Sequence, residues 1–247
     1  MRREDVLVPT PDGQAKGSLH VPDGDGPWPG VVVFPDAGSL RPTFLDMGDR
    51  LAELGYVVLV PDIYYRVGDW APFDMGSVFG NADERARLGK LMAGLTNERI
   101  VSDAGAYADF LLARPEVTGS AVGTTGYCLG GRMSLIAAGG LGDKIAAAAS
   151  FHGGRIAVGD DPTSPHLAAD RISATVYVAG AEGDGSYTTE QAELLEGALT
   201  DAGVTHTLEF YPAGHGFAVP DLPTYDKDAE ARHWAALDNL YSTALPR

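Results

Sequence analysis

Cysteine is nearly absent from this sequence, which has only one, Cys128, in 247 residues. A single cysteine cannot form a disulfide within the chain, and this composition suits a reducing compartment. The six histidines are scattered, without the spacing typical of metal ligands, and no cysteine pair accompanies them. We therefore expect neither a metal site nor a cofactor.

Positive charge is also scarce: 18 Lys and Arg stand against 34 Asp and Glu, for a formal net charge of −16. An acidic surface repels nucleic acid and anionic membranes, so we expect neither as a partner. No stretch reaches the ~18 apolar residues of a membrane span, and residues 1–5 are not followed by the apolar run of a secretory signal. We expect a cytoplasmic monomer or homodimer that binds a small molecule.

Apolar runs alternate with helical patterns along the chain. We predict buried strands at residues 30–35, 56–60, 121–125, 145–151, 174–179 and 205–211. We predict helices at residues 43–54, 83–93, 97–113, 132–138, 189–202 and 229–240, and irregular stretches at 62–80 and 153–170. This alternation predicts an α/β fold whose central sheet is mostly parallel, with helices on both faces. No linker divides the chain, so we expect one domain over residues 1–247.

The cysteine occupies a pattern of its own, GYCLGG at residues 126–131, between a predicted strand and a predicted helix. A nucleophile between glycines at a sharp strand-to-helix turn is the layout of a nucleophile elbow, where serine is usual. The glycines avoid collisions with the neighbouring strand and helix. The helix N-terminus favours a thiolate. A lone cysteine can also be a small buried hydrophobe, so the motif alone leaves catalysis and packing open.

Partners for a nucleophile appear later in the chain. His215 lies between two glycines in a loop after the last predicted strand, from which its imidazole can reach inward. Two carboxylates follow the strand that ends at residue 179, and we favour Asp184, which has glycine on either side, over Glu182. Such an acid would orient the imidazole through its Nδ1–H. His152 follows the small-residue strand and could line a pocket, although a structural role is its more ordinary explanation.

These segments together resemble the dienelactone hydrolase family of α/β-hydrolases. The resemblance is carried by VVVFPD at residues 31–36, GYCLGG at 126–131, SFHGG at 150–154 and AGHGF at 213–217. It implies the α/β-hydrolase fold and a triad of Cys128, Asp184 and His215. It also implies an oxyanion hole made by the backbone N–H groups of Ala37 and Leu129.

The chain departs from the family pattern at two places. Members commonly carry a glutamate just before the oxyanion donor that corresponds to Ala37, and this glutamate helps take the proton of the cysteine. Here the residue is Asp36, whose side chain is one methylene shorter. Asp36 could modulate the nucleophile or only pin its loop. The best-known members also bind a substrate carboxylate with arginines. One of those positions is Val219 here, and the other falls at Arg85 or Arg87, of which we prefer Arg85.

The aromatic stretch within residues 62–73 is a candidate pocket wall. Tyr64 and Trp70 could contact substrate there, with Arg66 as a partner for an anion. The same aromatic residues could instead be plain packing.

The resemblance implies a carboxylic ester hydrolase of the carboxymethylenebutenolidase type, which cleaves an ester or enol-lactone through a thioester on Cys128. Because thiolate is a good leaving group, activated esters and enol-lactones suit this chemistry better than amides. A glutamine amidotransferase would need a carboxylate two residues after His215, where Phe217 stands. A thioesterase, or a binding or stress protein that keeps the fold without catalysis, remains an alternative.

Overall fold

A computed structural model describes residues 1–245 of the chain. Its eight strands form one sheet in the order β1-β2-β4-β3-β5-β6-β7-β8. The strands are β1 (Arg2–Thr10), β2 (Gly13–Val21), β3 (Trp28–Phe34), β4 (Val57–Pro61), β5 (Val117–Tyr127), β6 (Ile145–Phe151), β7 (Thr175–Ala181) and β8 (His206–Tyr211). Every pair from β4 to β8 is parallel, whereas β1–β2 and β2–β4 are antiparallel. The predicted α/β fold with a mostly parallel sheet is confirmed.

Within residues 1–245, six α-helices accompany the sheet: α1 (Pro42–Glu53), α2 (Ala82–Met92), α3 (Asn97–Leu112), α4 (Leu129–Leu141), α5 (Thr189–Asp201) and α6 (Lys227–Ala244). Short 3-10 turns occur at Tyr65–Val67, Gly142–Lys144 and Pro165–Arg171. The helix starts follow local chemistry, because four of them are capped by a side-chain oxygen that accepts N–H bonds of the first turn. These caps are Asn81, Thr96, Thr188 and Asp226.

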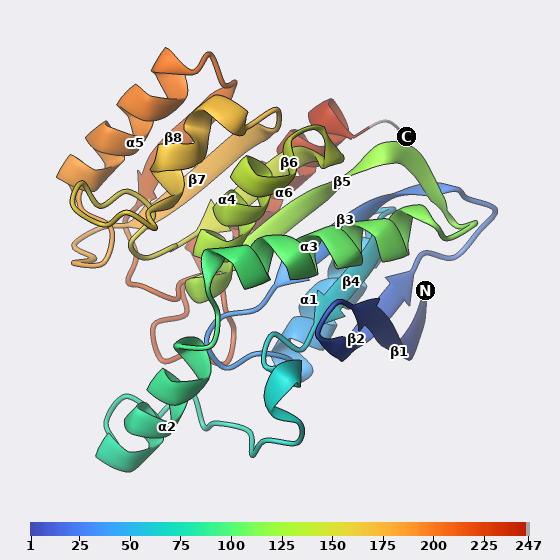
Figure 1. Ribbon diagram of the computed structural model, residues 1–247, viewed down its shortest axis with the longest axis horizontal. Coiled ribbons are helices and arrows are strands. Elements are labelled where there is room, and N and C mark those ends of the chain that lie inside the picture. Colours follow the sequence, from blue (N-terminus) through green and yellow to red (C-terminus); the bar gives the residue numbers. More distant parts are fainter. Residues whose placement is uncertain (246–247) are drawn as a thin grey trace.

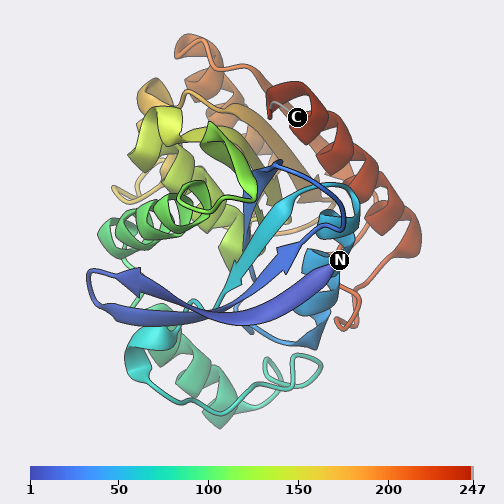
Figure 2. The ribbon, with the colours of Figure 1, turned by 90° about the vertical axis from the view of Figure 1, so that its right-hand side faces the viewer.

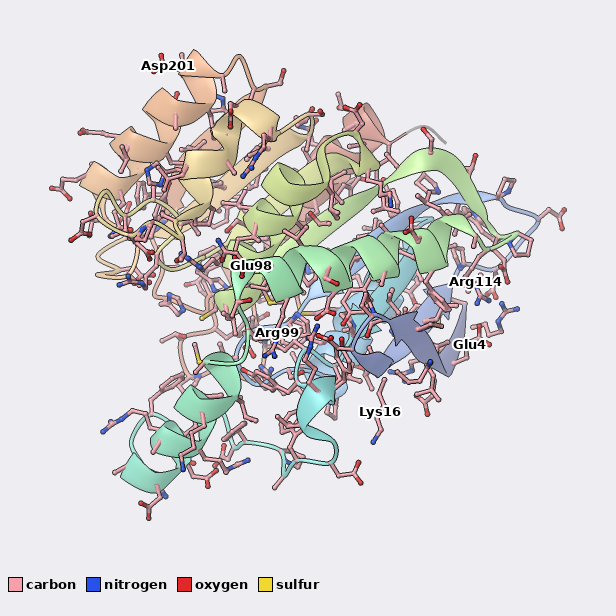
Figure 3. The ribbon with its side chains drawn as sticks, in the orientation of Figure 1. Glu4, Lys16, Glu98, Arg99, Arg114 and Asp201 are labelled. Atoms are coloured by element: carbon pink, nitrogen blue, oxygen red, sulfur yellow. The ribbon has the colours of Figure 1, made fainter. Side chains whose placement is uncertain are left out.

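The sheet has a hydrophobic layer on each face. Val31 and Val33 of β3 pack with α1 and α6, whereas Val32 and Phe34 pack with α3 and α4, because successive strand residues point to opposite faces. Figure 2 shows the sheet between α6 on one side and α3 on the other. In Figure 1, α2 lies apart from the other helices. Charged side chains such as Lys16 and Asp201 lie at the periphery (Figure 3).

The N-terminal hairpin was missed by the sequence analysis, which assigned no element before residue 30. β1 and β2 pair through a tight turn that leads into Gly13, whose φ is 133°. The Asp12-Gly13 dipeptide was the available signal, since this pair is typical of hairpin turns. The irregular stretch at 153–170 also contains the turn Pro165–Arg171. No helix of residues 1–245 has the length and apolar character to cross a membrane. The predicted domain runs to residue 247, and its last two positions lie outside the described residues.

Candidate active site

Cys128 stands at a strained turn between β5 and α4. Its φ of 55° and ψ of −113° lie outside the regions that residues with side chains ordinarily adopt. The Cys128 N–H donates to the Phe151 carbonyl at 3.0 Å, and the Cys128 carbonyl accepts from the Arg132 N–H at 3.3 Å. The end of β6 and the first turn of α4 therefore hold the strained backbone in place. The cysteine residue is partly exposed.

The glycines around the cysteine are needed for close backbone approach. A Cβ on Gly126 would lie 1.9 Å from the Gly130 carbonyl oxygen, and one on Gly130 would lie 2.1 Å from that of Phe34. Real side chains do not tolerate such distances. The steric explanation of the GYCLGG pattern is thus confirmed, and the start of α4 abuts the end of β3.

His215 and Asp184 meet at the same edge of the sheet. The Nδ1 atom of His215 lies 2.6 Å from the Asp184 Oδ2 atom, and the Ser186 N–H donates to Asp184 Oδ1 at 2.8 Å. The Asp184 side chain is 7% exposed, whereas Glu182 is exposed. The structure therefore pairs the histidine with the favoured acid. Ser186 was not expected from the sequence, although an Asp side chain often accepts a hydrogen bond from the backbone N–H two residues on.

The electrostatic environment of His215 favours its charged form. Burial alone would lower the pKa of His215, but its hydrogen bond and charge interaction with Cys128, followed by those with Asp184, raise it to about 9. Burial would raise the pKa of Asp184, yet the bonds from His215 and Ser186 lower it. The cysteine and the carboxylate together therefore favour the charged form of the imidazole that lies between them.

The two expected oxyanion donors lie on adjoining segments. Ala37 is buried in the loop after β3, and its carbonyl accepts a hydrogen bond from the Tyr64 hydroxyl at 2.9 Å. Leu129 is the first residue of α4, where backbone N–H groups have no carbonyl one turn earlier to bind. Their joint use as an oxyanion hole stays a prediction.

Asp36 makes contacts that fit loop pinning. Its two carboxylate oxygens accept from the Arg41 guanidinium at 2.6 and 2.8 Å, and one of them also accepts from the Gly38 N–H at 2.8 Å. The sequence left two roles open for Asp36, modulating the nucleophile and pinning its loop. These contacts fit the pinning role. Arg41 was not anticipated, and no local pattern indicates it.

The aromatic residues expected at the pocket wall pack mainly on each other. The Tyr64 ring meets Trp70 edge-on, with centroids 5.5 Å apart, and the Trp70 Nε1–H donates to Asp62. Burial, and then the negative charges of Asp36 and Cys128, raise the pKa of the buried Tyr64 hydroxyl. Contact of Tyr64 or Trp70 with substrate stays a prediction.

The candidate arginines have partners within the protein, and contact of Arg85 with substrate stays a prediction. Arg85 is exposed and donates to the Phe79 carbonyl, whereas Arg87 lies 3.6 Å over the Phe73 ring. Arg66 binds buried Asp103 through two nitrogens, at 2.6 and 2.7 Å, and Asp12 through a third. The expectation that Arg66 serves a substrate anion is corrected accordingly, because two carboxylates already balance its charge.

His152 does not line an open pocket. Its side chain is fully buried, and its ring lies edge-on to His215, with centroids 5.2 Å apart, and to Phe217 at 4.9 Å. Burial, and then the positive charges of His215 and His233, lower the pKa of His152. His152 is therefore a buried, neutral imidazole that packs against His215, and the expectation that it lines a pocket is wrong.

Comparison with known proteins gives a match to one protein family. The model of the dienelactone hydrolase family matches residues 16–245. The chain belongs to this family. It is 30% identical over 244 residues to a Synechocystis protein provisionally named carboxymethylenebutenolidase, covering 97% of this chain and 96% of that one. This membership makes the protein a hydrolase and supports activity on esters or lactones.

Solved structures show the same fold. A Klebsiella pneumoniae protein provisionally titled dienelactone hydrolase superposes with a TM-score of 0.84 at 22% identity, over 98% of both chains. A dienelactone hydrolase-like promiscuous phosphotriesterase from metagenomic libraries gives a TM-score of 0.76 at 29% identity, over 99% of both chains.

Among residues 1–245 no group of three or more His, Cys, Asp or Glu side chains is arranged to hold a metal ion.

Proposed function

We propose that this dienelactone hydrolase family member hydrolyses an activated ester or an enol-lactone, with Cys128 as nucleophile, His215 as acid and base, and Asp184 as the orienting carboxylate. The observation that carries the proposal is one imidazole that bonds to Asp184 at 2.6 Å and also interacts with the cysteine of the strained turn. A nucleophile, a base within reach and an acid behind the base are the parts that covalent acyl transfer requires.

The first half of the reaction transfers the acyl group to sulfur. The thiolate forms a C–S bond to the substrate carbonyl carbon, and the backbone N–H groups of Ala37 and Leu129 stabilise the resulting oxyanion. Each donor of this kind contributes about 3–4 kcal/mol to the transition state in other enzymes. Collapse of the intermediate breaks the C–O bond, and the departing alkoxide or enolate takes the proton of His215. The product of this half is a thioester on Cys128.

Water completes the cycle. Neutral His215 accepts a proton as water attacks the thioester carbon, and the C–S bond then breaks to restore the thiolate and imidazolium. Asp184 stabilises the cation in both halves. An enolate or aryl oxide departs more readily than an amine, so activated esters and enol-lactones are the expected substrate class.

A substrate with a carboxylate is less favoured. Val219, at the position where the best-known relatives carry an arginine, is buried and uncharged. We also propose a cytoplasmic location and no nucleic-acid partner, supported by the net charge of −16 and the single cysteine. A monomer or homodimer remains our prediction for the assembly.

The deciding experiment compares the wild type with Cys128→Ala on aryl acetates, enol-lactones, thioesters and an aryl dialkyl phosphate. The last substrate is included because a similar solved structure is titled a phosphotriesterase. We expect Cys128→Ala to abolish turnover while its urea midpoint stays close to that of the wild type. Mass spectrometry of the wild type mixed rapidly with an aryl acetate should show an acetyl group on Cys128. Full turnover by folded Cys128→Ala would end the proposal, and thioesters as the best substrates would favour a thioesterase.

A further inference from the structure

One buried arginine joins the two loops that flank the proposed active site. Arg41, just before α1, donates from Nη1 and Nη2 to Asp36 at 2.6 and 2.8 Å. Its Nε and Nη2 atoms also donate to Asp221 at 2.7 and 2.9 Å. The side chains of Arg41 and Asp36 are only 9% and 2% exposed. A planar guanidinium that binds two carboxylates at once is a geometry that lysine cannot reproduce.

The two carboxylates belong to segments with different tasks. Asp36 precedes Ala37, the proposed oxyanion donor, and its bond from the Gly38 N–H closes a tight turn around that residue. Asp221 lies six residues beyond His215, on the loop that follows the histidine. Positions 41 and 221 are 180 residues apart in the sequence. One side chain thus connects the loop of the oxyanion donor with the loop of the base.

The segment that carries Asp36 lies against the turn of the nucleophile, since a Cβ added on Gly130 would lie 2.4 Å from the Pro35 carbonyl oxygen. The Tyr64 hydroxyl donates to the Ala37 carbonyl, and after burial the charges of Asp36 and Cys128 are the main causes that raise the pKa of Tyr64. An uncompensated carboxylate here would oppose both the thiolate and the oxyanion, because like charges repel strongly where water is excluded. The guanidinium of Arg41 balances that charge.

We propose that Arg41 is a positioning residue of this hydrolase: it neutralises Asp36 beside the nucleophile and holds the Ala37 loop against the His215 loop. The inference rests on the proposed function. It assigns the removal of the Cys128 proton to His215, and it makes Asp36 the anchor of Arg41 rather than a proton acceptor.

The two possible roles of Asp36 predict opposite rankings of the activity lost by Asp36→Asn and by Arg41→Met. If Asp36 took the cysteine proton, Asp36→Asn would be the more harmful change. If Arg41 neutralises Asp36, Arg41→Met is the more harmful, because it leaves a buried carboxylate without its partner. Replacing both residues removes the uncompensated charge, so the double variant should recover part of what Arg41→Met loses.

The experiment measures kcat and KM on an aryl acetate, and the rate of Cys128 alkylation by iodoacetamide at pH 7. For Arg41→Met we expect kcat to fall roughly 10–100-fold with KM within about 3-fold, and alkylation to slow about 10-fold. Asp36→Asn should lose less than this, and the double variant should return to within about 3-fold of Asp36→Asn. The control is Arg50→Met at the far end of α1, where Arg50 also binds a carboxylate, Glu230 at 2.9 Å, and lies 4.3 Å over an aromatic ring.

Three results would overturn the inference: Arg41→Met behaving like the Arg50 control, Asp36→Asn being the slower single variant, or no recovery in the double variant. If Arg41→Met does not fold, Arg41→Lys replaces it. Lysine keeps the charge but cannot span both carboxylates, so alkylation should stay within about 3-fold while kcat falls, and unchanged kcat would refute the positioning role. Cys128→Ala is assayed in parallel. Turnover by that variant would refute the proposed function, while the alkylation rates would still report on Arg41.

Discussion

Replacing Gly130 by alanine should damage this protein, although alanine is the better helix former. Gly130 is the second residue of α4, and an added Cβ would lie 2.1 Å from the Phe34 carbonyl oxygen and 2.4 Å from that of Pro35. An ordinary carbon–oxygen contact is about 3.3 Å or more, so the start of α4 and the end of β3 must separate by about 1 Å. Both partners are backbone atoms and cannot rotate away.

The size of the effect follows from that displacement. Overpacking ordinarily costs about 1–3 kcal/mol and occasionally more, and contact against rigid backbone belongs at the upper end. We expect Gly130→Ala to lose about 3 kcal/mol of unfolding free energy. The same movement separates Leu129 from Ala37, the two proposed oxyanion donors. A misplacement of about 1 Å costs on the order of 100-fold in rate, so kcat should fall by at least that factor.

Gly197→Ala in α5 is the matched control. Gly197 is also a helical glycine, but no atom lies within 4 Å of the position its Cβ would take. Here alanine should add about 0.5–1 kcal/mol of stability, because glycine loses more backbone entropy on folding. Urea unfolding measures both variants, and aryl ester turnover is assayed alongside. The reasoning fails if Gly130→Ala unfolds within about 0.5 kcal/mol of the wild type with unchanged kcat.

Three further predictions concern the charged groups. His215→Gln should slow alkylation of Cys128 at pH 7 by about 10-fold. Because the pKa of His215 is raised to about 9, the imidazole is charged below that pH and neutral above it. The alkylation rates of wild type and variant should therefore converge near pH 10, and a ratio of the two rates that does not change with pH would contradict this. Asp184→Asn should lower kcat at least about 100-fold while Glu182→Gln changes it by less than about 2-fold, and the reverse order would identify the other acid. Arg66→Met should cost about 3–5 kcal/mol in urea unfolding, because it strands a buried carboxylate, and a higher KM at unchanged stability would restore a substrate role.

The sequence by itself determined the features that depend on neighbouring residues. The strained turn at Cys128 and its glycines could be recognised from six consecutive letters, because a nucleophile between glycines at this spacing is a recurrent motif. The collision that demands Gly126 is also local, since a Cβ there would meet Gly130. Buried strands were recognisable as apolar runs, and their alternation with helices was enough to predict the parallel sheet. His215 was found because its loop follows the last strand at the edge where the other strands also end.

Only the tertiary structure decided which distant side chains meet. Asp184 and Glu182 stand in the same loop, and their difference is that one carboxylate reaches His215, 31 residues away, while the other faces solvent. In the sequence Arg66 looked like a free cation, and Arg41 went unnoticed. Their carboxylate partners lie 37 and 180 residues away, respectively. Pairing over such separations depends on how the loops pack at the end of the sheet, and no local pattern of residue types carries that information.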